Sequence, residues 1–135
     1  MEPEILELIQ KRMTTSYNEQ LWAVALVASM SGFVIMQVDR LVASIDYKKI
    51  RLGIWIVTSL CVLFILLRHG VYLHYNSIID QEFSIIKELP PTMTFLRYVV
   101  LSSGVLLYTS ITVGMSIAAV LTCKKAVKLK KDAEK

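Results

Sequence analysis

Two histidines and two acidic residues that follow them are the first candidates for chemistry. His69 and His74 are five residues apart, with Asp80 and Glu82 shortly after them. Imidazole nitrogens and carboxylate oxygens are common metal ligands. A spacing of five, however, does not bring two side chains onto one face of a helix as a spacing of four does. We therefore expect no metal or haem site, and we interpret the histidines as a pair near the membrane surface.

Short motifs of catalytic and nucleotide-binding sites are absent from the rest of the sequence. It contains no G-x-S-x-G, no H-E-x-x-H, no P-loop and no dinucleotide fingerprint. Cys61 lies within an apolar segment and Cys123 at the end of another, so we expect both to be free thiols. The sequence therefore predicts a protein that is not an enzyme and carries no cofactor.

Three long apolar segments predict the fold that positions these residues. The longest uncharged stretch, residues 98–122, would form a helix of roughly 37 Å, which exceeds a hydrocarbon core of about 30 Å. The whole chain is 55% hydrophobic, above the usual value for soluble domains. We predict an all-α integral membrane protein, in which residues 1–135 form a single membrane domain. Its three transmembrane helices are expected at about 21–38, 51–75 and 97–122.

Two further segments have an apolar face and a polar face when drawn as helices. In residues 3–19 the apolar side chains recur at helical spacing, and in residues 77–89 a similar pattern ends before Pro90 and Pro91. We predict an N-terminal amphipathic helix on the membrane surface or on a partner, and an interfacial amphipathic helix between spans two and three. Alternatively, the N-terminal segment continues into the first span and serves in dimerisation or gating.

Small residues recur along one face of the first and third spans. Small side chains allow helix backbones to approach closely in lipid. We interpret these residues as helix-packing or oligomer interfaces: Ala25, Ala28, Ser29 and Gly32 in the first span, and Ser110, Gly114 and Ala118 in the third. Hydroxyl residues of the third span, including Thr112 and Ser116, fit either bundle packing or the lining of a pore.

The basic tail of residues 123–135 predicts the orientation in the membrane. We interpret five of its lysines as anchors to lipid headgroups on the cytoplasmic side: Lys124, Lys125, Lys128, Lys130 and Lys131. The tail and residues 39–51 hold ten basic residues, against five on the other side. The N-terminus is therefore expected outside and the C-terminus in the cytoplasm, in a plasma or inner membrane. At the edge of the first span, Asp39 could pair with Arg40 or Arg51.

Together these features favour a non-enzymatic subunit that oligomerises or joins a larger membrane complex. The expected partners are the lipid bilayer, further copies of the chain and other membrane subunits. No nucleic-acid partner is expected, because the tail has no aromatic or arginine residues with which to read one. The alternative is a homo-oligomeric pore or a membrane-permeabilising protein. Three spans with an outer N-terminus and a lysine-rich inner tail resemble phage holins in layout, without a shared motif.

Overall fold

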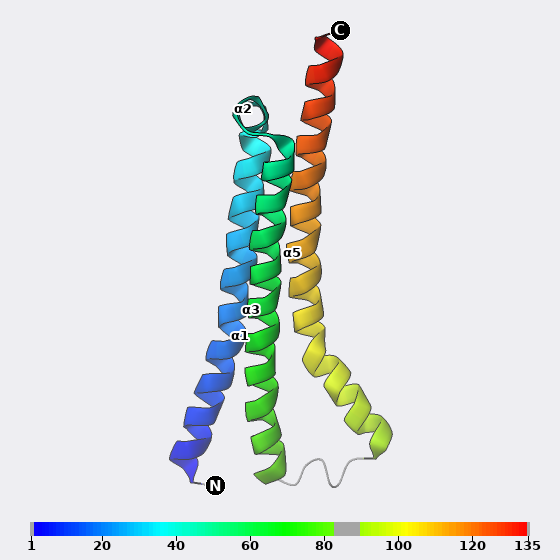
Figure 1. Cartoon of the computed structure of the whole chain (residues 1–135). Helices are drawn as coiled ribbons and strands as arrows, with labels where there is room; N and C mark the ends of the chain where they lie inside the picture. The colour runs from blue at the N-terminus through cyan, green and yellow to red at the C-terminus, as the bar shows by residue number, and fades with distance from the viewer. Residues whose placement is uncertain (1, 83–89, 135) are drawn as a thin grey trace.

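Three long α-helices and one short α-helix make up the described part of the chain. The computed structural model describes residues 2–82 and 90–134. Its elements are α1 (Pro3–Met36), α2 (Val38–Ser44), α3 (Tyr47–Glu82) and α5 (Pro91–Ala133). Helices α1, α3 and α5 pack side by side, and α2 lies across one end of this bundle (Figure 1). The C-terminal end of α5 lies at the α2 end of the bundle, and the N-terminal end of α1 lies at the other (Figure 1).

The three long helices have the dimensions and the surface of membrane spans. Each is long and apolar enough to cross a membrane, with 34, 36 and 43 residues in α1, α3 and α5. In the most apolar 18-residue stretch of each helix, only 28% of α1, 22% of α3 and 22% of α5 is buried inside the protein. Large apolar side chains such as Leu60 and Leu106 therefore cover the outer surface. Because water does not favour so extensive an apolar surface, we conclude that this is an all-α membrane protein with three candidate spans.

Helix α1 contains both the predicted N-terminal segment, residues 3–19, and almost all of the first span. Pro3 occupies its first turn, and no further proline or glycine occurs before Gly32. Without a helix breaker the backbone hydrogen bonds continue through the predicted boundary at residues 19–21. The N-terminal amphipathic helix is therefore not a separate element, which corrects the predicted boundary.

The second predicted amphipathic helix, residues 77–89, is only partly described. Ser77–Glu82 continue α3 without a break, so they do not begin a new helix. Residues 83–89 lie outside the described residues.

Helix α2 occupies part of the segment that connects the first two long helices. Val38, Leu41 and Val42 are half-buried against the bundle, whereas Asp39 and Arg40 are exposed. After α2 ends, Asp46 accepts a hydrogen bond from the backbone N–H of Lys48 at 3.2 Å, and this caps the start of α3. The connection between the first two long helices is thus itself an amphipathic helix.

The interior of the bundle contains two apolar clusters. The first lies between α1, α3 and α5 in the middle of the bundle and consists of Ala23, Val27, Cys61, Ile65 and Val105. The second lies next to α2 and consists of Val34, Ile50, Ile54, Ala119 and Cys123. Alanine and cysteine are small, so they allow close approach of the helices. Both cysteines are buried free thiols, as expected.

Candidate functional site

The small residues of α1 face away from the bundle. Ala25, Ala28 and Ser29 are exposed and Gly32 is partly exposed. The residues that α1 buries in this region are Ala23, Val27, Ser31 and Val34. At 3.6 residues per turn, these two sets lie on opposite sides of the helix. The predicted interface on α1 is therefore on the outer surface of the single chain.

The small residues of α5 face outward in the same way. Ser110, Gly114 and Ala118 are exposed, whereas α5 packs inward with Val105, Thr112, Ser116, Ala119 and Cys123. A Cβ atom added at Gly32 or Gly114 would meet no atom within 4 Å. The fold of the single chain thus does not require a glycine at either position.

The hydroxyl groups of the inner face of α5 bond within the bundle. Thr58 Oγ1 and Ser116 Oγ lie 2.6 Å apart between α3 and α5. Ser116 also donates to the carbonyl of Thr112 at 3.0 Å, and Thr112 donates to the carbonyl of Tyr108 at 2.7 Å. Thr112 and Ser116 are thus in a helix-packing position. The sequence analysis did not single out Thr58. The sequence of one helix does not show which residues of a neighbouring helix will lie opposite it.

A cluster of three tyrosines joins the helices in the half of the bundle that is remote from α2. Tyr108 donates a hydrogen bond to Tyr17 at 2.9 Å, and the rings of Tyr17 and Tyr72 have centroids 6.3 Å apart. Gly104 lies next to this contact, and a Cβ there would meet the Tyr17 ring at 3.4 Å, which is an ordinary van der Waals distance. His69 stacks on Tyr72 with centroids 6.1 Å apart.

Two ion pairs extend this polar region. Arg68 Nε lies 2.6 Å from Glu19 Oε2 and connects α3 to α1. Arg97 pairs with Asp80 and connects α5 to α3, and Asn76 donates to the same carboxylate at 3.0 Å. An opposite charge and a hydrogen bond reduce the cost of burying the Asp80 carboxylate. Sequence reasoning did not pair these residues, because the partners come from different helices.

The histidines do not belong to a metal-binding cluster in the described part of the chain. Among those residues, no group of three or more His, Cys, Asp or Glu side chains is placed to hold a metal ion. His69 is half-buried against Tyr72, whereas His74 is exposed beside Tyr75. The polar region therefore joins the three helices through tyrosines and ion pairs.

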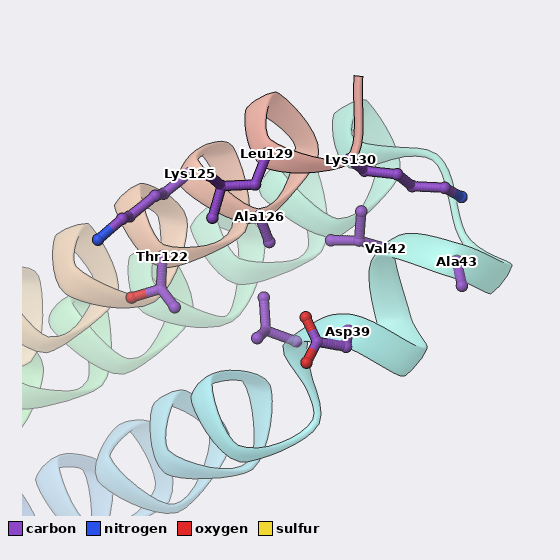
Figure 2. Close-up of a pocket in the computed structure, with 9 residues that line it drawn as sticks. Asp39, Val42, Ala43, Thr122, Lys125, Ala126, Leu129 and Lys130 are labelled. Atoms are coloured by element: carbon purple, nitrogen blue, oxygen red, sulfur yellow. The ribbon is translucent and has the colours of Figure 1, made fainter. Parts of the chain in front are cut away.

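The predicted lysine anchors lie at the opposite end of the bundle. Helix α5 extends past α1 and α3 there (Figure 1), and all five lysines are exposed: Lys124, Lys125, Lys128, Lys130 and Lys131. Two of them, Lys125 and Lys130, line a groove between α5 and α2, with Asp39 on its other wall (Figure 2). In the described structure Asp39 forms no ion pair with Arg40 or Arg51, so the pairing expected from the sequence is not found.

No protein-family model, curated protein or solved structure matches this chain.

Proposed function

We propose that this protein is a non-enzymatic subunit of a membrane assembly and binds further helices through its outward-facing small residues. The partner is a second copy of the chain or another membrane protein. In this arrangement the N-terminus lies outside the cell and the lysine-rich end of α5 lies at the cytoplasmic surface of the plasma or inner membrane.

The observation that carries the proposal is the exposed strip of Ser110, Gly114 and Ala118 on α5, with a glycine at its centre. A glycine within a helix costs about 1 kcal/mol relative to alanine, and the single chain gains no contact from it. Ser110 and Ala118 lie one turn away on either side, so the helix has a smooth strip with no large side chain. Such a strip lets a second backbone approach closely and gain van der Waals contacts that lipid tails do not provide.

The orientation is supported by the distribution of charge. The α2 end of the described chain has nine basic residues against four acidic ones, and positively charged ends remain in the cytoplasm. The basic residues at this end are Arg40, Lys48, Lys49, Arg51, Lys124, Lys125, Lys128, Lys130 and Lys131.

Native mass spectrometry of the protein in nanodiscs tests this proposal. The wild-type particle is expected to contain a second copy or another membrane chain. Gly114→Leu should weaken that association by roughly tenfold or more, because the leucine holds the partner backbone away. Gly70→Leu is the matched control, since Gly70 is also exposed and a Cβ there also meets no atom within 4 Å.

Three results would contradict the proposal. The first is a wild-type particle that contains one chain and no partner. The second is an equal loss of association in Gly114→Leu and Gly70→Leu. The third is a closed ring of this chain alone that conducts ions through a central path, which would make the protein a pore.

A further inference from the structure

The groove between α2 and α5 lies where two spans reach the edge of the bilayer. It has a volume of about 450 Å³. One wall begins at Val38, the last residue of the predicted first span, and the other begins at Thr122, the last residue of the predicted third span. With these predicted boundaries, the groove is expected at the depth of the lipid headgroups and of the parts of the acyl chains next to them.

The groove combines an apolar floor with charged groups at its sides. Figure 2 shows Val42 of α2 across from Ala126 and Leu129 of α5. Lys125 and Lys130 extend in opposite directions from the α5 wall, and the Asp39 carboxylate projects from the α2 side.

The charged groups of the groove have no ionic partner in the described part of the chain. Neither lysine ammonium lies within 4.0 Å of a carboxylate, and the Asp39 carboxylate lies within 4.0 Å of no basic group. An exposed lysine side chain is long and flexible, so each ammonium remains able to bind an anion at the groove.

We propose that this groove binds one anionic glycerophospholipid whose headgroup carries a hydroxyl group. On binding, the flexible side chains of Lys125 and Lys130 turn toward the groove, and the phosphate oxygens accept hydrogen bonds from their ammonium groups. A headgroup hydroxyl donates a hydrogen bond to the Asp39 carboxylate. A phosphate without such a hydroxyl would only be repelled by this carboxylate. The first part of an acyl chain covers Val42, Ala126 and Leu129. The inference requires that the helices cross a bilayer, and it is independent of whether the chain oligomerises.

Charge complementarity identifies the occupant as a lipid rather than a protein. The groove lies in a region with an excess of basic residues, and the cytoplasmic leaflet attracts such regions through its anionic headgroups. Leu129 of the apolar floor is 60% exposed, so an acyl chain can cover it. A soluble anion would leave that floor exposed to water.

Native mass spectrometry with defined lipids tests the site. The wild-type protein is purified and titrated with phosphatidylglycerol, phosphatidic acid, phosphatidylcholine or inorganic phosphate. Phosphatidylglycerol is expected to remain bound at one copy per chain. The double variant Lys125→Gln and Lys130→Gln should bind phosphatidylglycerol about tenfold more weakly, or worse, than the control variant Lys124→Gln and Lys128→Gln. Both variants lose two positive charges from α5, but the control residues do not line the groove.

The variant Asp39→Asn tests the role of Asp39. Asp39→Asn should reduce the preference for phosphatidylglycerol over phosphatidic acid by about threefold or more, since an amide accepts the hydroxyl hydrogen bond less strongly than a carboxylate.

The proposal is overturned by any of four results. These are equal lipid loss in the two double lysine variants, equal retention of phosphatidylcholine, saturable binding of inorganic phosphate that displaces the lipid, and an unchanged lipid preference in Asp39→Asn. The number of chains per particle is read from the same spectra. A strictly monomeric particle that binds the lipid would therefore contradict the proposed assembly and leave the lipid site supported.

Discussion

At the scale of single residues, the buried Asp80 carboxylate depends strongly on its bonding partners. The Asp80 side chain is 3% exposed, whereas the side chain of its partner Arg97 is 28% exposed. A carboxylate shielded from water depends on its partners to offset its lost hydration, but a long arginine side chain can redirect its charge toward solvent or headgroups. Asp80 therefore depends on Arg97 more than Arg97 depends on Asp80.

We expect Arg97→Met to lower the free energy of unfolding by about 3 kcal/mol, because it leaves a buried charge without its counterion. Asp80→Asn should cost less than half as much, and the double variant should resemble Asp80→Asn alone. Reversible unfolding in detergent micelles measures the three values. Arg12→Met is the control, since Arg12 is exposed and forms no ion pair in the described structure. Equal losses from the two single variants would contradict this account.

At the scale of elements, the continuity of α1 distinguishes the structure from the simplest interpretation of the sequence. An amphipathic segment before an apolar span is compatible with a surface helix followed by a bend. In the structure Ile9, Ser16 and Gln20 are buried along the same helix that later buries Ala23 and Val27. Packing against α3 and α5 therefore favours a continuous helix across the predicted boundary.

Spin labels at Glu7→Cys and Ser29→Cys test this continuity, since both side chains are exposed. In one straight helix these positions lie about 33 Å apart along the axis. A right-angle bend near residue 19 would reduce the separation to about 23 Å. Pulsed electron paramagnetic resonance in nanodiscs measures the distance, in a background of Cys61→Ala and Cys123→Ala. A dominant distance near the shorter value would show that α1 is bent in the membrane.

At the scale of the whole molecule, charge is distributed unevenly along the bundle. The α2 end has an excess of basic residues, and at the other end the described residues include more acidic than basic side chains. The apolar surface of the three long helices lies between these ends. This arrangement favours one direction of insertion, because translocating the lysine-rich end would remove its charges from the anionic leaflet.

We expect single cysteines at the two ends to react from opposite sides of the membrane. In a background of Cys61→Ala and Cys123→Ala, Gln10→Cys should react with an impermeant maleimide added to intact cells. Lys131→Cys should react only after the membrane is permeabilised. Both positions are exposed in the structure, so access to the reagent is limited by the membrane alone. The reverse pattern would contradict the proposed orientation, and labelling of both from outside would indicate dual insertion.

The sequence by itself determined the class of the protein and the three apolar segments that form its candidate spans. Long uncharged segments between basic residues indicate helices in a bilayer, since backbone groups there must bond within their own helix. The same local information revealed the small-residue strips and the basic tail, and predicted free cysteines. It did not place the boundary of the first helix, because a segment with an apolar stripe is equally suited to a surface helix and to a packed one.

The tertiary structure decided which faces of the helices meet. The small-residue strips face outward, and Thr58 and Ser116 are buried between helices. The tyrosine cluster joins the helices but stays partly exposed. In an apolar helix, hydrophobicity does not distinguish the side toward lipid from the side toward protein, because the two surroundings are almost equally apolar. The contact between α2 and α5 likewise depends on how α1 ends and on how far α5 continues. The groove with Asp39, Lys125 and Lys130 therefore exists only in the folded chain.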